Sequence, residues 1–160
     1  MELLGVRVEV PANTPVLMLR EQEGRQWLLP IYIGGPEATA IHYVLEGVTP
    51  PRPLTHDLFV NVLAALDTSL AAVVITEVHD HTYFAELHLT VGGESKVVSS
   101  RPSDAIALAV RSGTPIFASA ELLDEVGQEP EPDPESEPPT EAIVDEFRDF
   151  IEHVNPDDFA

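Results

Sequence analysis

Residues 129–139, EPEPDPESEPP, limit what this chain can fold into more than any other part of its sequence. Five prolines and five acids in eleven positions leave no aliphatic or aromatic side chain to bury. Such a segment cannot offset the conformational entropy lost on ordering. We therefore expect an extended polyproline-like linker at 128–140. It would separate a globular domain at 1–127 from a short segment at 141–160.

The segment after the linker has an apolar stripe on an otherwise acidic background. Its apolar residues recur at the spacing of one helix face, which predicts a C-terminal amphipathic helix. This stripe needs a partner, which is its own domain, a neighbouring subunit or another protein. The residues concerned are Ile143, Phe147, Phe150, Ile151 and Val154.

Charge is spread unevenly along the chain, whose formal net charge is −20. Residues 1–120 contain 13 acids and 7 bases, whereas residues 121–160 contain 15 acids and Arg148 as their one base. Seven basic side chains cannot build a broad phosphate-binding surface, because neutralisation of phosphates provides most of the affinity of nucleic-acid binders. Any nucleic acid, RNA or DNA, is therefore expected at a small focal site.

Residue usage excludes several other classes of protein. The chain has no cysteine, which excludes a disulfide framework, a thiolate metal site and a thiol nucleophile. No stretch of eighteen apolar residues is present, so no membrane-spanning helix is predicted. Glu2 lies where a signal peptide carries positive charge. We therefore expect a cytoplasmic protein with no membrane association.

Hairpins and helices alternate along the domain. Leu4, Val6, Val8 and Val10 alternate with small or charged residues, the period of two typical of a half-buried strand. Comparable patterns, separated by turns rich in glycine and proline, predict strands at 16–19, 27–33, 72–78, 83–91, 96–99 and 115–118, and helices at 36–47, 55–66, 102–113 and 120–126. The predicted fold class is a compact α+β domain with a mixed or antiparallel sheet.

Two further features refine this prediction. Residues 72–78 are nearly all apolar and should form a central strand, whereas Pro30 favours an edge position or a bulge for 27–33. Pro36 and Gly47 enclose one predicted helix, and Pro102 and Gly113 enclose another of the same length, 66 residues further on. A hairpin–helix (ββα) unit used twice would account for this spacing, and so would chance.

Three helix starts carry the residues with chemical potential. Glu37 follows Gly34 to Pro36, and the other two starts read RPLTHD (52–57) and RPSD (101–104). A helix N-terminus presents unpaired N–H groups and partial positive charge, and an arginine just before it can bind the same phosphate. The expected substrate-binding residues are Arg52, Thr55, Arg101 and Ser103.

The acids in these first turns would suit a divalent cation, Mg²⁺ or Mn²⁺, which prefers oxygen ligands. Such an ion lowers the pKa of a bound water, arginine stabilises phosphoryl charge and a histidine moves the proton. The predicted metal ligands are Glu37, Asp57 and Asp104, and the predicted catalytic residues are Arg52, His56, Asp57, Arg101 and Asp104. The competing interpretation is purely structural, because Ser, Thr and Asp commonly cap helices and each arginine can pair with its neighbouring acid.

The same segments resemble the bifunctional nuclease (BFN) domain family. The resemblance rests on LPIYIG (29–34), PRPLTHDL (51–58) and RPSDAIALA (101–109), and it extends over about residues 1–127. One departure is the pair Ser99 and Ser100, where members of the family commonly carry an acid and a small residue. If that acid is a ligand in the family, this chain lacks it.

The resemblance implies a bacterial protein of actinobacterial type, with a compact α+β fold, assembly into homo-oligomers such as dimers, and hydrolysis of phosphodiester bonds in RNA and DNA. The alternative is a non-catalytic binding or regulatory module that engages a protein partner through its acidic tail and apolar helix. Truncation at Gly127 would discriminate between these two functions.

Overall fold

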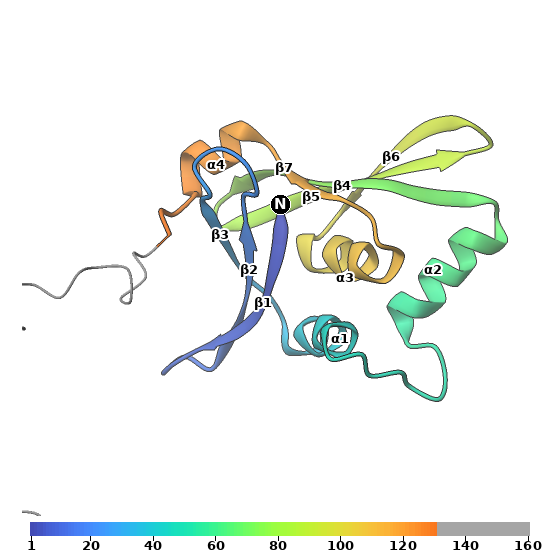
Figure 1. Cartoon of the computed structure of the whole chain (residues 1–160), viewed down its shortest axis with the longest axis horizontal. Helices are drawn as coiled ribbons and strands as arrows, with labels where there is room; N and C mark the ends of the chain where they lie inside the picture. Colours follow the sequence, from blue (N-terminus) through green and yellow to red (C-terminus); the bar gives the residue numbers. More distant parts are fainter. Residues whose placement is uncertain (131–160) are drawn as a thin grey trace, which may run out of the picture. The chain divides into compact units, whose positions relative to one another are not determined.

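The computed structural model describes residues 1–130, and residues Met1–Glu129 form one compact unit. The predictions made for the linker beyond Pro130 and for the C-terminal helix lie outside the described residues. Within the described part, the chain contains both strands and helices (Figure 1). The predicted α+β class is confirmed.

The strands form two sheets rather than one. The first sheet is antiparallel, in the order β1-β2-β3. The second has the order β6-β5-β4-β7, in which β7 alone runs parallel to its neighbour, β4. The strands are β1 (Glu2–Glu9), β2 (Thr14–Arg20), β3 (Leu28–Tyr32), β4 (Thr68–His79), β5 (Thr82–Val91), β6 (Glu94–Ser100) and β7 (Ile116–Ala118). As predicted, β4 is central, and β3, which contains Pro30, lies at an edge.

Two helices join the sheets through a shared core. The helix α3 contacts β4 and β5, α1 contacts β1 and β2, and α1 packs against α3 (Figure 1). The helices are α1 (Gly35–Leu45), α2 (Thr55–Ala65), α3 (Pro102–Ser112) and α4 (Ala120–Val126). Side chains at this junction, including Leu17, Ile41, Ile75 and Ile106, are fully buried. Each contributes about 2 kcal/mol by leaving water.

The sequence of α3 explains its central place. Residues Ala105 to Ala109 are all buried. Three of these five are alanines, which let neighbouring backbones approach closely. Gly113 ends the helix with a φ of 66°, a left-handed conformation that glycine adopts without steric cost. The predicted buried helix and its stop at Gly113 are confirmed.

The predicted pseudo-repeat is larger than a hairpin and a helix. Three antiparallel strands, β1-β2-β3, precede α1, and three more, β4-β5-β6, precede α3. Both helices have eleven residues. The repeated unit is therefore βββα. The helix of each copy carries an acid in its first turn, Glu37 in α1 and Asp104 in α3.

The helix α2 begins at the predicted residue but is less buried than the other helices. Leu54 is its N-cap, and Thr55 is its first helical residue. No residue of α2 is fully buried. Among the described helices, none has the length and apolar character that crossing a bilayer requires.

Candidate active site

The starts of α1, α2 and α3 meet around an open cavity of about 630 Å³. Five of the predicted site residues line it: Glu37, Thr55, His56, Arg101 and Asp104. Glu37 is in the first turn of α1, His56 in the first turn of α2, and Arg101 and Asp104 at the start of α3. Residues 64 positions apart in the sequence, Glu37 and Arg101, are thus in direct contact.

Arg101 lies between two carboxylates. Its Nε is 2.6 Å from Asp104 Oδ2, and its Nη2 is 3.1 Å from Asp104 Oδ1. The same Nη2 is 2.9 Å from Glu37 Oε1. The side chain is still 66% exposed. Among residues 1–130, Nη1 has no hydrogen-bond partner, so one end of the guanidinium is free for a ligand.

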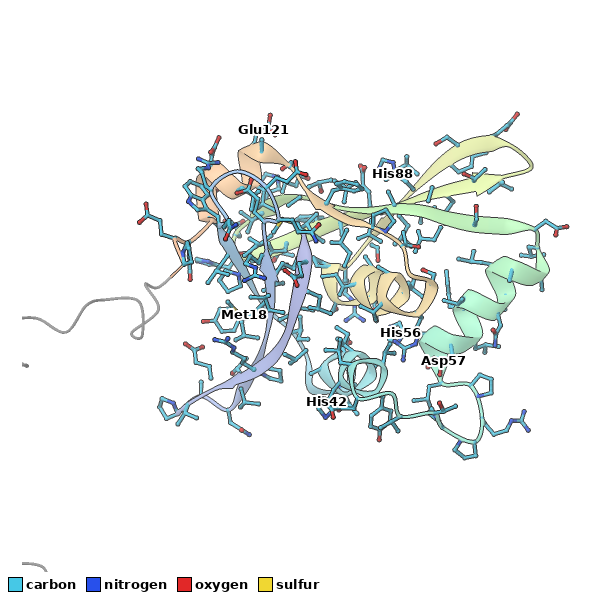
Figure 2. The ribbon with its side chains drawn as sticks, in the orientation of Figure 1. Met18, His42, His56, Asp57, His88 and Glu121 are labelled. Carbon is cyan, nitrogen blue, oxygen red and sulfur yellow. The ribbon has the colours of Figure 1, made fainter. Side chains whose placement is uncertain are left out.

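His56 completes the cluster on the side of α2. Its Nε2 is 3.1 Å from Asp104 Oδ1, and its side chain is mostly buried. Figure 2 shows His56 and Asp57 at the beginning of α2, close to α1 and α3. Within the described part of the chain, Nδ1 of His56 has no partner. This orientation is that of a histidine held by a carboxylate, with its second ring nitrogen available for proton transfer.

Asp104 is ionised in this cluster at neutral pH. Burial on its own would raise the pKa of its carboxyl group, but the hydrogen bonds from Arg101 and His56 outweigh burial. The pKa of Asp104 is therefore held below its ordinary value. An ionised Asp104 accepts hydrogen bonds from both neighbours, which fixes the positions of the guanidinium and the imidazole.

Asp57 does not join this cluster. Its Oδ1 is 2.6 Å from Nε of Arg111, and its Oδ2 accepts a hydrogen bond of 2.8 Å from the backbone N–H of Leu54. Adjacent residues of an α-helix are rotated by about 100°. When His56 faces Asp104, Asp57 therefore faces a different side, where it lines a second cavity together with Arg111.

Arg111 is the residue that the sequence analysis missed. Its side chain is only 7% exposed, and besides Asp57 it donates to the carbonyl oxygens of Ala107 and Ala40. One guanidinium thereby links α1, α2 and α3. The hydrogen bond from Arg111 is the main reason that the pKa of Asp57 is lowered. The signal in the sequence was a charged residue at the end of an apolar helix, which requires a buried partner.

The other predicted residues lie near the cluster or outside it. Thr55 lines the cavity. Ser103 lines a neighbouring cavity, which Arg101 also borders. Arg52 is exposed and is not among the residues that line either space. Ser100 hydrogen-bonds the carbonyl oxygen of Arg101 and supplies no carboxylate.

The predicted set of three metal ligands does not fit a divalent cation as the side chains lie. Glu37 and Asp104 are bound to the Arg101 guanidinium, and Asp57 is bound to Arg111. In residues 1–130, no three His, Asp or Glu side chains are grouped so that they could hold a metal ion.

The fold and the cluster define an α+β domain with an ion-pair site where three helices begin. Residues 17–131 match the model of the bifunctional nuclease domain family. The chain belongs to this family, as the resemblance of its motifs predicted.

Relatives of known sequence agree with this assignment. The uncharacterized protein Rv1829 of Mycobacterium tuberculosis is 44% identical over 161 residues, which cover 98% of this chain and 95% of that protein. It agrees with the predicted actinobacterial type. Bifunctional nuclease 2 of rice (Oryza sativa subsp. japonica) is 30% identical over 70% of this chain and 35% of its own length. Bifunctional nuclease 2 of Arabidopsis thaliana is 35% identical over 62% of this chain and 31% of its own length. The chain thus spans about a third of these plant relatives.

Proposed function

We propose that this protein is a nuclease that hydrolyses phosphodiester bonds of RNA or DNA in the cavity where α1, α2 and α3 begin. Membership of the bifunctional nuclease domain family supports this function, as do the names of the plant relatives. The observation that carries the proposal is the chain of contacts from His56 through Asp104 to Arg101 at one cavity.

Arg101 is the proposed phosphate-binding residue. Its Nη1 is free of partners within residues 1–130, while its other nitrogens are held by Asp104 and Glu37. A guanidinium fixed in this way presents its remaining N–H groups in one direction and loses little entropy on binding. The unpaired N–H groups in the first turn of α3 add partial positive charge at the same place.

His56 is the proposed general base. Its Nε2–H donates to ionised Asp104, which leaves Nδ1 as the acceptor. In the proposed reaction, Nδ1 takes a proton from water while the water oxygen bonds to phosphorus. The bond from phosphorus to the leaving sugar oxygen breaks, and that oxygen receives the proton from His56. The products are a phosphate monoester and a free hydroxyl group.

The dependence on a divalent cation stays a prediction. A cation bound by Glu37 or Asp104 would offset the excess negative charge of the cluster, but Arg101 would first have to release that carboxylate. Cleavage measured with Mg²⁺, with Mn²⁺ and with EDTA tests this prediction directly.

The first prediction concerns His56→Gln, which removes the basic nitrogen and retains a polar side chain. We expect cleavage of end-labelled RNA and DNA oligonucleotides to fall by about 10²- to 10⁴-fold, the usual contribution of a general base. Single-turnover cleavage by the full chain and the variant, purified in parallel, is the measurement.

His88→Gln is the matched control for this variant. His88 is also 3.1 Å from a carboxylate, that of Glu86, but lies on the face of the second sheet away from α3 (Figure 2). Its loss should leave cleavage unchanged. Equal rates for His56→Gln and the wild type would refute the assignment of His56. Cleavage that falls equally in both variants would show that the loss is not specific to His56 and would also refute the assignment.

A second candidate function is a non-catalytic module that binds a protein. One observation favours it, namely that Leu58, Phe59, Val62 and Leu66 at α2 and its C-terminal end remain exposed. An apolar helix face of this kind is typical of a contact surface. In this case the Arg101 cluster would only join the three helices. Substitution of its residues would lower the stability of the fold, and the wild type itself would show no hydrolysis.

A further inference from the structure

A smaller cavity of about 260 Å³ shares Arg101 with the site described above. It is formed by the end of β3, the turn between β4 and β5, and the start of α3. Arg101 borders both cavities. A ligand whose anionic group contacts Arg101 can therefore extend into either space.

Ser103 provides an unusual polar group in this second cavity. It is 7% exposed and is the only buried polar residue among residues 1–130. Its hydroxyl has no hydrogen-bond partner there, although buried polar groups are normally paired. Since no polar side-chain atom of this part is both sealed from solvent and unpaired, the hydroxyl keeps some contact with solvent, and Ser103 is among the residues that line the cavity. It is a donor and acceptor available to a ligand.

Aromatic side chains form the rest of the wall. Two of the three tyrosines of the chain, Tyr32 and Tyr83, line this cavity together with His81. Tyr32 is 59% exposed at the end of the edge strand β3, so this side chain is accessible to a ligand. His81 is held by a two-residue turn in which Asp80 and His81 have φ values of 47° and 61°.

A guanidinium beside an accessible aromatic ring and a free hydroxyl is a combination that suits a nucleotide. The aromatic ring can stack on any of the bases, and the hydroxyl can hydrogen-bond the edge of the stacked base. A base inside a duplex is stacked on both faces and paired along its edge, so it cannot enter a recess of this size without leaving the helix.

We propose that this second cavity binds one unpaired base of a single-stranded RNA or DNA whose adjoining phosphate contacts Arg101. The proposal rests on the proposed nuclease function and assigns its substrate class as single-stranded nucleic acid. Tyr32 supplies the stacking surface, and Ser103 bonds the base edge.

The test is the affinity of the full-length chain for a short fluorescent single strand and for the matching duplex, measured by anisotropy in EDTA. Tyr32→Ala should weaken single-strand binding by about 5- to 150-fold, because stacking on an aromatic side chain has this effect per base. Tyr32→Phe, which keeps the ring, should stay within about twofold. Ser103→Ala should weaken binding by about 2- to 10-fold. Binding of the duplex should not respond to these changes.

Phe117→Ala is the matched control, because Phe117 is 50% exposed on β7 and does not line this cavity. The proposal is overturned if Tyr32→Ala binds the single strand as tightly as Phe117→Ala does, if single strand and duplex lose affinity equally, or if the wild type binds no single strand. Tyr32-dependent binding without any cleavage by the wild type would leave the subsite standing and refute the nuclease function. Cleavage by the wild type that Tyr32→Ala leaves unchanged would support the nuclease function and refute the subsite.

Discussion

At the scale of single residues, charge balance around Arg101 decides what the site can bind. One guanidinium faces the two carboxylates of Glu37 and Asp104, so the cluster carries one excess negative charge while His56 is neutral. An approaching phosphate is attracted by the free end of Arg101 and by the partial positive charge of the helix starts at the cavity. A proton on His56 or a bound cation would remove the excess charge.

Asp57 allows a prediction about pH. The pKa of Asp57 is lower in the folded protein than in the unfolded chain, so its ion pair with Arg111 stabilises the fold at neutral pH. This stabilisation is complete above the ordinary pKa of about 4 and is lost as pH falls through the lower, folded value. Asp57→Asn should cost about 2 kcal/mol at pH 7, and its difference from the wild type should shrink in strong acid. Urea unfolding at pH 7, 4 and 3 measures both. A constant difference across this range would contradict the assignment.

These residue contacts also show which parts of the site could be predicted from the sequence. The helix starts that carry Glu37 and Asp104 were predicted from caps and glycines, and the structure brings these two side chains to one cavity. The partners of His56 and Asp57 were not predictable, because a rotation of α2 by one residue exchanges the faces on which they lie. Arg111 was missed because its partners come from three helices, which the sequence alone does not bring together.

At the scale of elements, α2 depends on the rest of the domain for its position. It has no fully buried residue, and its first turn is held by the bonds from Asp57 to Arg111 and from His56 to Asp104. Val60 and Leu63 pack α2 against the core while only partly buried, so these polar contacts add to the apolar packing that sets the direction in which His56 points. The sequence predicted a helix here because its apolar residues recur with helical period, but that period did not reveal how little of α2 is covered.

Arg111→Met tests this dependence. The substitution keeps an unbranched apolar side chain but leaves the Asp57 carboxylate and the carbonyl oxygens of Ala40 and Ala107 without their donor. We expect a loss of about 3 kcal/mol in the free energy of unfolding, the usual cost of removing one partner of a buried ion pair. Arg20→Met, which breaks the exposed pair with Glu2, should cost less than about 1 kcal/mol. Equal effects in urea titrations of the two variants would show that Arg111 has no special structural role.

At the scale of the whole molecule, two sheets and the paired helices α1 and α3 build one core within Met1–Glu129. Two βββα units with the same order of elements place the starts of α1 and α3 next to each other. The spacing of Pro36 to Gly47 and Pro102 to Gly113 predicted a repeat. It did not predict the third strand in each unit, because Glu2–Glu9 and Thr68–His79 belong to the repeat through pairing rather than through shared residues.

A chain that ends after Pro130 tests what this unit does alone. We expect its free energy of unfolding to stay within about 0.5 kcal/mol of that of the full chain and its cleavage rate to be unchanged, because the described core lies within Met1–Glu129.

We expect a dimer by light scattering in both forms, and Phe59→Glu to convert it to a monomer, since Phe59 lies on the exposed face of α2. A truncated chain that stays folded but no longer dimerises would favour the binding module, and a monomeric full chain would exclude the dimer.

The meeting of three helix starts has a consequence for how the proposed activity can be lost. Glu37, His56 and Arg101 are separated by intervals of 19 and 45 residues, and each is aimed by tertiary contacts. No proteolytic fragment that lacks α1 or α3 could hold the three side chains together. Hydrolysis should therefore appear only in the final, fully assembled state during refolding, and a single nick between the helices would silence it before the far-ultraviolet circular dichroism spectrum changed noticeably.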